Sequence, residues 1–338
     1  LRDGVPTTSA ALEGQRDRYE NLFSALENAG IERGSLVQAW SFTTASSRSI
    51  RGDLLAMRDD ALSRVPVGEG ECTVLEVQED PGDQRRFRRL DGTFRSPLYM
   101  DRDGPGARVV RGEDGLPSFQ GWIEVPFTLT VPRVLAEPGV APGRLLGYGH
   151  GLMGAAEGEG GGGYVQDVAQ QFSYVMVATD WQGMSQDDLV TVGTALSNVS
   201  TFPKVSDRLK QGVINQLVMM RAFKGACREL PELMVDGNSV IDEGPPYWMG
   251  ISQGGIMGPA VLALSPEVTR AAFLVGGISY PLMIGRSVDF YDYEIIFRTW
   301  YPERVDREVL MNMMSSLWDG AEAATWAPHL TDNPLPGV

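Results

Sequence analysis

The chain has 338 residues, which suits one large α/β domain with extensions or two modest domains. Its 44 acidic and 29 basic residues give a formal net charge of −15, and such a chain repels phosphate backbones, so no nucleic-acid partner is expected. No apolar run approaches the roughly 18–20 residues that a membrane span needs, so the sequence predicts no transmembrane span.

The only two cysteines are Cys72 and Cys227. Two cysteines are too few for a disulfide scaffold or a zinc cluster, and no metal site is expected. The sequence leaves two interpretations open: two separate thiols, or one disulfide bridge.

Residues 1–120 are expected to form an N-terminal extension of mixed helices and strands. Apolar residues at helical spacing indicate two helices, and alternating stretches indicate two strands. These elements are the helices Arg16–Ala29 and Arg51–Val65 and the strands Leu36–Thr43 and Cys72–Val77. The charged segment Asp80–Gly115 contains Pro-Gly and Asp-Gly pairs and is predicted to be a turn-rich loop.

Residues 121–280 alternate between strand and helix patterns. The predicted strands are Ile123–Val131, Arg144–Tyr148, Tyr174–Thr179, Pro246–Met249 and Ala271–Val275, and the predicted helices are Val165–Phe172, Val205–Phe223 and Ile256–Leu264. Such alternation predicts an α/β core with a doubly wound, mostly parallel sheet. The glycine-rich run Gly158–Gly163 is typical of a mobile loop.

Residues 281–338 are predicted to be a helical cap and linker segment. The helices Val288–Trp300 and Arg307–Trp318 are rich in aromatic residues and methionine, as suits helices that cap a site or pack as core. No further apolar strand follows Ala271–Val275, so the sheet is expected to lack its last strands.

The sequence Gly250-Ile251-Ser252-Gln253-Gly254 has the G-x-S-x-G pattern of a nucleophile elbow. A strand pattern precedes it and a helix pattern follows it, which is the context that the motif requires. The serine hydroxyl would then lie at a helix N-terminus, where developing negative charge is favoured. The alternative is a glycine-rich turn with a capping serine.

A second motif, Gly149-His150-Gly151, directly follows the predicted strand Arg144–Tyr148. A His-Gly pair about 100 residues before an elbow is typical of an oxyanion loop. The backbone N–H groups of Leu152 and Gln253 are the predicted oxyanion donors, with His150 and Gly151 supporting the loop. In the alternative, His150 is the general base.

These motifs and their order resemble the α/β-hydrolase family over roughly Trp122–Tyr280. Residues before Trp122 resemble the N-terminal extension of secreted bacterial lipase-like hydrolases. The resemblance implies a serine esterase or lipase that cleaves carboxylic esters or lipids through an acyl-enzyme on Ser252, with no metal or organic cofactor. It also implies a secreted or cell-surface location in a bacterium.

In that family the acid and the histidine base follow the serine. His329 is the only histidine after Ser252. Either His329 is the base, oriented by Asp319 or Asp332, or it is a loop residue. In the second case a second polypeptide is expected to complete the sheet and supply the acid and the histidine, and the chain is a fragment of a longer or cleaved hydrolase.

Two other function classes stay open. A non-catalytic hydrolase-like protein of a surface or assembly would need neither acid nor base. A peptidase or acyltransferase could also use the same fold, because a fold does not fix a reaction.

Overall fold

The computed structural model describes residues 1–79 and 82–336. The predicted turn at Pro81 and the last two residues of the predicted linker lie outside these ranges. Contacts divide the chain into two units, Leu1–Ser46 and Ser47–Val338.

The first unit is helical. It contains α1 (Ala10–Glu13) and α2 (Arg16–Asn28), and α2 confirms the helix predicted there. The strand predicted at Leu36–Thr43 is wrong, since this segment has no regular structure. Its residues alternate as in a strand, but it has no backbone pairing with another segment, and a strand is stable only in a sheet.

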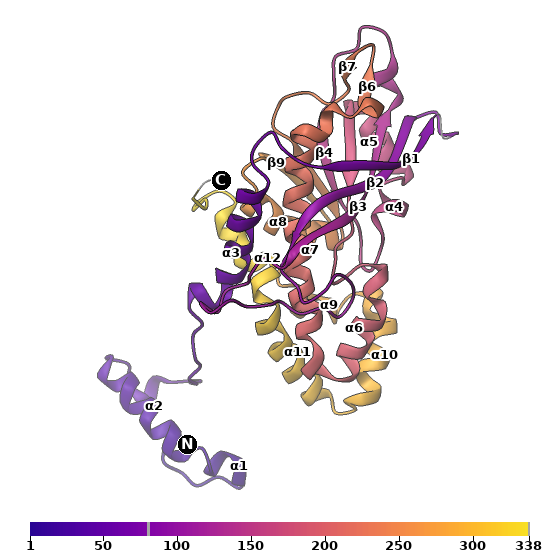
Figure 1. Cartoon of the computed structure of the whole chain (residues 1–338). Coiled ribbons are helices and arrows are strands. Elements are labelled where there is room, and N and C mark those ends of the chain that lie inside the picture. Colours follow the sequence, from indigo (N-terminus) through magenta and orange to yellow (C-terminus); the bar gives the residue numbers. More distant parts are fainter. Residues whose placement is uncertain (80–81, 337–338) are drawn as a thin grey trace. The chain divides into compact units, whose positions relative to one another are not determined.

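The second unit is built on a seven-stranded sheet in the order β1-β2-β3-β5-β4-β8-β9 (Figure 1). Five strands (β2, β5, β4, β8 and β9) run in one direction, and β1 and β3 run against them, so the sheet is mostly parallel as predicted. The strands are β1 (Cys72–Glu79), β2 (Arg86–Leu98), β3 (Gly121–Pro132), β4 (Arg144–Gly149), β5 (Tyr174–Ala178), β8 (Tyr247–Ile251) and β9 (Arg270–Leu274). A separate short hairpin is formed by β6 (Met234–Val235) and β7 (Asn238–Ser239).

Strand β2 lies inside the segment that was predicted to be a turn-rich loop, and this prediction is wrong. Arg88 pairs with Glu79 at 2.6 Å and Arg89 with Asp91 at 2.8 Å, so the charges of β2 are neutralised along the sheet. Leu90 and Phe94 share one face of β2 with Arg88 and are fully buried. The arginines interrupt the apolar pattern, so the sequence does not reveal the strand.

The predicted boundary at residue 120 does not separate two units. Strands β1 and β2 precede it, yet they continue the same sheet as β3. Cys72 of β1 is also disulfide-bonded to Cys227, which settles the choice between free thiols and a bridge. On helix α3 (Ser47–Arg64), Asp53 pairs with Arg111 at 2.7 Å and with Lys210 at 2.8 Å.

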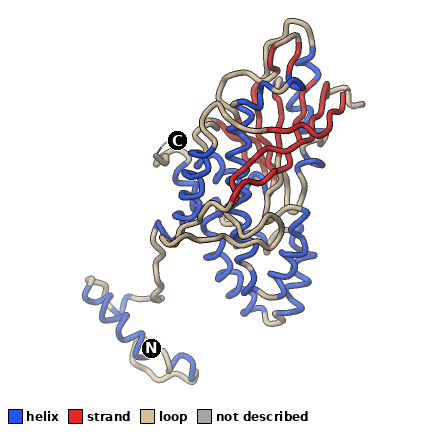
Figure 2. Tube along the Cα trace, viewed as in Figure 1, coloured by secondary structure: helices blue, strands red, loops and turns tan. Residues whose placement is uncertain are grey.

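Helices cover both faces of the sheet (Figure 2). One face packs against α5 (Gly163–Phe172) through a small buried cluster that includes Leu146 and Met176. The other face packs through the main core against α3, α7 (Pro203–Lys224) and α8 (Gln253–Leu264). No helix in the described ranges is both long and apolar enough to span a membrane.

A helical cap lies at the carboxyl end of the parallel strands, opposite the β6–β7 hairpin (Figure 1). It consists of α6 (Leu189–Ser197), α9 (Tyr280–Ile284), α10 (Tyr291–Trp300) and α11 (Arg304–Trp318), followed by α12 (Ala323–Trp326). No strand follows Leu274 in the described part of the chain, so β9 pairs only with β8 and forms the edge of the sheet. The predicted helical segment after the core sheet is confirmed.

Candidate functional site

Ser252 stands at the sharp turn between β8 and α8. Its backbone φ of 53° and ψ of −119° lie in a region that non-glycine residues rarely adopt. Its N–H donates to the carbonyl oxygen of Leu274 at 3.0 Å, which ties the turn to β9. Its hydroxyl has no hydrogen-bond partner within the described residues. Strained backbone of this kind concentrates at functional sites.

Glycine is required on both sides of the serine because the backbone segments approach very closely. A Cβ atom at Gly250 would overlap the backbone carbonyl of Gly254. A Cβ atom at Gly254 would overlap the carbonyl oxygen of Gly149, at the end of β4. The spacing of the motif therefore reflects contact between β8, α8 and the end of β4.

The loop Gly149–Gly154 begins beside this turn, because Gly149 pairs in register with Gly250 on the neighbouring parallel strand. The structure thus combines this strand order with a strand–serine–helix turn and a His-Gly loop, which lie at the ends of two neighbouring parallel strands. The chain has an α/β-hydrolase-like fold. In such a fold, ligands bind at the carboxyl ends of the parallel strands, where both of these turns lie.

His150 is fully buried, and both of its ring nitrogens are engaged. Nε2 accepts the N–H of Trp181 at 2.8 Å, so the proton is assigned to Nδ1, which donates to the Gly151 carbonyl oxygen at 2.8 Å. The Gly151 C=O and the Leu152 N–H belong to one trans peptide and point in opposite directions. The ring thus fixes the direction of the Leu152 N–H. Because the lone pair of Nε2 is occupied, His150 does not suit the role of general base.

Glu159 holds the same loop through the other side of Gly151. Its Oε2 accepts the Gly151 N–H at 2.7 Å and the Tyr148 hydroxyl at 3.4 Å. Tyr148 also shares a hydrogen bond of 2.6 Å with Tyr164, and burial raises the pKa of Tyr148. Glu159 ends the short helix α4 (Ala156–Glu159), within the run predicted to be a mobile loop. No sequence signal marks it, because its partner is a backbone group.

The predicted oxyanion donors are the backbone N–H groups of Leu152 and Gln253. Neither the N–H of Leu152 nor that of Gln253 has a backbone acceptor in the described ranges. The buried Gln253 side chain donates to the Met184 carbonyl oxygen at 2.9 Å and accepts the Tyr280 hydroxyl at 3.4 Å. These bonds hold the first turn of α8 between the loop after β5 and α9. That the two N–H groups converge on one point stays a prediction.

His329 does not hydrogen-bond to Ser252. Its Nδ1 lies 2.6 Å from the carbonyl oxygen of Asn333, and its Nε2 contacts the guanidinium of Arg51 on α3. Arginine can only donate, so Nε2 accepts and has no free lone pair for a serine proton. The imidazole instead joins the segment after α12 to α3. This arrangement favours the loop-residue interpretation.

The carboxylates considered as orienting groups do not contact His329 either. Asp332 accepts a hydrogen bond from Thr331 at 3.2 Å, and burial, together with nearby Glu322, raises the pKa of Asp319. Another carboxylate, Asp180, lies 3.9 Å from His150 Nε2 of the loop Gly149–Gly154, and burial raises its pKa. Across the described residues, no three His, Cys, Asp or Glu side chains are grouped so that they could hold a metal ion.

Comparisons of this chain with known proteins found similarity only at the level of three-dimensional structure. Acetyl xylan esterase 1 from Thermoanaerobacterium sp. JW/SL YS485 is 14% identical with a TM-score of 0.45, and covers 85% of this chain and 80% of its own. Acetyl xylan esterase from Paenibacillus sp. R4 is 15% identical with a TM-score of 0.44 (83% and 76% covered). A mutant of the rice cell wall degrading esterase LipA from Xanthomonas oryzae is 16% identical with a TM-score of 0.39 (80% and 71% covered). No family model and no curated protein sequence matches.

Proposed function

We propose that the protein is a serine hydrolase that cleaves carboxylic esters of small molecules or lipids through an acyl-enzyme on Ser252. The observation that carries the proposal is the strained turn at Ser252, which lies beside the loop of His150 and whose hydroxyl has no hydrogen-bond partner among the described residues. A capping serine would use its hydroxyl to accept a backbone N–H of the helix, and the Ser252 side chain makes no such bond.

The proposed reaction has two steps, acylation and deacylation of Ser252. The Ser252 oxygen attacks the ester carbonyl and its proton passes to a general base. The N–H groups of Leu152 and Gln253 bind the oxyanion that forms, and the alcohol leaves with a proton from the protonated base. Water then attacks the acyl-enzyme, the base takes the water proton, and the acid is released as Ser252 regains its hydrogen. His150 and Glu159 act as positioning residues for the Leu152 peptide.

The base itself is proposed to come from another polypeptide segment. The chain's two histidines, His150 and His329, both have their ring nitrogens engaged. One edge of β9 pairs with no other strand in the described part of the chain, and an unpaired edge is a template for a further strand. A second chain that pairs with β9 would bring an acid and a histidine to the carboxyl end of the sheet, next to Ser252.

Because the ring nitrogens of both histidines already have partners, a second candidate function is also favoured. A non-catalytic hydrolase-like protein of a surface or assembly would keep the fold and need no free imidazole. It would not activate Ser252. For either candidate we propose a location outside the cytoplasm, supported by the Cys72–Cys227 bridge, because disulfides persist in oxidising compartments.

Ester hydrolysis by purified protein tests the proposal. The wild-type protein, assayed together with the chain that pairs with β9, is expected to hydrolyse p-nitrophenyl acetate, and Ser252→Ala is expected to lose this activity with an unchanged melting temperature. Ser287→Ala, an exposed serine at the start of another helical turn, is the matched control and should keep full activity. Equal rates for wild type and Ser252→Ala would refute the proposal.

A further inference from the structure

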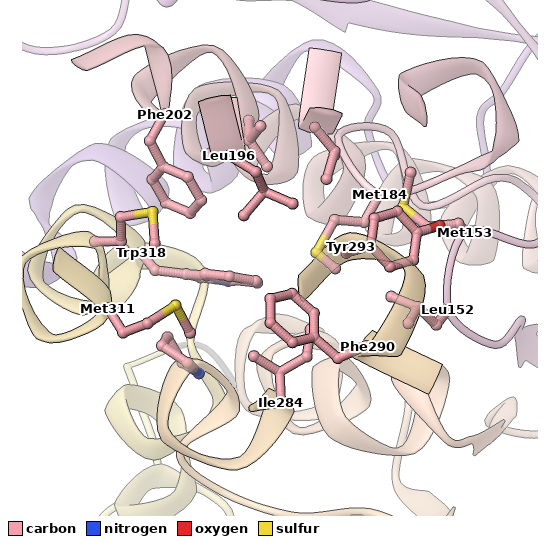
Figure 3. Close-up of a pocket in the computed structure, with 14 residues that line it drawn as sticks. Leu152, Met153, Met184, Leu196, Phe202, Ile284, Phe290, Tyr293, Met311 and Trp318 are labelled. Carbon is pink, nitrogen blue, oxygen red and sulfur yellow. The ribbon is translucent and has the colours of Figure 1, made fainter. Parts of the chain in front are cut away.

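An apolar cavity of about 40 Å³ lies between the predicted oxyanion loop and the helical cap (Figure 3). Its 14 lining side chains are all aliphatic, thioether or aromatic. In Figure 3, Phe202 and Leu196 point into the space from one side and Ile284 and Phe290 from the other. Packed cores leave few voids larger than a water molecule, so a cavity of this size beside a candidate site is a candidate ligand pocket.

We propose that this cavity binds the acyl group of the ester and that its α11 wall limits the acyl chain to a short one. The inference rests on the proposed function, since it assigns a substrate class to the same site. The proposed substrates are esters of short aliphatic acids, from acetyl to about butyryl in length.

The position of the cavity links it to the predicted oxyanion donors. The side chain of Leu152 lines the cavity, while its own N–H is one of the two donors. Met184 also lines the cavity, and its carbonyl oxygen binds the side chain of Gln253, the other donor. An ester carbonyl held by these N–H groups has its acyl carbon chain only a few bonds from the cavity, so the chain is expected to enter it.

The size of the cavity sets the expected chain length. A water molecule needs at least about 10–15 Å³ of such volume, so the cavity holds about three heavy-atom groups. Four of the lining residues are methionines, whose flexible side chains repack easily: Met153, Met184, Met311 and Met314. A longer chain would have to displace Met314 and Trp318 of α11, both of which are buried.

Helix α11 supplies a matched pair of methionines for the test. Met314 is 4% exposed and lines the cavity, whereas Met313, one residue earlier, is 60% exposed and turns away from it. Alanine at either position removes the same atoms and leaves the helix propensity change the same. Only the change at Met314 enlarges the cavity.

The first experiment measures kcat/KM for the p-nitrophenyl esters of acetate, butyrate and octanoate. Met314→Ala is expected to raise the octanoate-to-acetate ratio about tenfold or more, since each methylene in an apolar pocket changes kcat/KM by roughly tenfold. Met313→Ala is expected to leave the ratio unchanged. A folded Met314→Ala protein with the wild-type ratio would overturn the proposal.

A second experiment does not depend on catalysis. The Ser252→Ala protein is titrated with methyl butyrate while the fluorescence of Trp318 and the other tryptophans is recorded, and saturable binding is expected. Adding Met314→Trp should fill the cavity and weaken this binding about tenfold, whereas Met313→Trp should not. Absence of binding, or binding indifferent to Met314→Trp, overturns the acyl pocket. Binding without hydrolysis by the wild-type protein, assayed together with the chain that pairs with β9, supports the pocket and refutes the proposed function.

Discussion

Replacing Glu159 with alanine removes the carboxylate that accepts the Gly151 N–H at 2.7 Å. That bond and the His150 bond on the Gly151 carbonyl hold the peptide planes on both sides of Gly151, and the second of these planes carries the Leu152 N–H. A hydrogen bond to a charged group contributes about 1.5–3 kcal/mol. Because Glu159 is half-buried and water can replace part of the bond, we expect the lower end of this range.

A loss of about 1.5 kcal/mol from the transition state corresponds to about a tenfold fall in kcat. Glu159 has no predicted contact with the substrate, so KM should change little. The assay is steady-state hydrolysis of p-nitrophenyl acetate. Glu159→Gln should lose less activity than Glu159→Ala, because its amide oxygen can still accept the Gly151 N–H.

Glu157→Ala is the matched control, since Glu157 lies in the same short helix and its side chain is 80% exposed. It is expected to keep the wild-type kcat. The reasoning would be refuted by a Glu159→Ala protein that has the wild-type melting temperature and a kcat within about twofold of wild type, since a lost brace should cost more than that.

Two further predictions concern stability. Burial raises the pKa of Asp53, but Arg111 and Lys210 outweigh it and lower the pKa to about 2. The ionised carboxylate should therefore add up to about 2 kcal/mol to the free energy of unfolding above pH 4, and this contribution should disappear as the pH falls towards 2. In urea unfolding, the free energies of wild type and Asp53→Asn should converge over this pH range, and a constant difference would contradict the prediction. The bridge between Cys72 and Cys227 joins residues 155 positions apart, so Cys72→Ser should lower the free energy of unfolding by about 3–5 kcal/mol. The measurement is a urea titration without reductant, and an unchanged unfolding midpoint would contradict a closed bridge.

The core of the fold could be predicted from local patterns because its elements are uniform. The strand Tyr174–Ala178 is a continuous apolar run, as is typical of a buried parallel strand. Apolar residues at helical spacing locate the helix Pro203–Lys224, although they do not predict that its polar and charged side chains are buried as well. Strand Arg86–Leu98 could not be predicted this way, since its arginines break the apolar pattern and Arg88 finds its acidic partner, Glu79, on the neighbouring strand. The segment Leu36–Thr43 shows the converse, because an alternating pattern without a partner strand forms no sheet.

The candidate site was predictable only in part, for a similar reason. The turn at Ser252 can be read from glycines that local geometry requires. The carboxylate of Glu159 and the guanidinium of Arg51 act on a backbone N–H and on His329, and no spacing rule relates these residues to their partners. The engagement of His329 could be recognised only once α3 and the segment after α12 were seen side by side.

The most direct test of the account is whether Ser252 is chemically activated. The protein is incubated with a fluorophosphonate, which reacts with activated serines and not with ordinary ones, and the adduct is located by peptide mass mapping. The account predicts one adduct on Ser252, with none formed by Ser252→Ala. The account would be contradicted if the protein stayed unlabelled both by itself and together with a chain that binds the edge of β9. It would also be contradicted by an adduct that persists in Ser252→Ala.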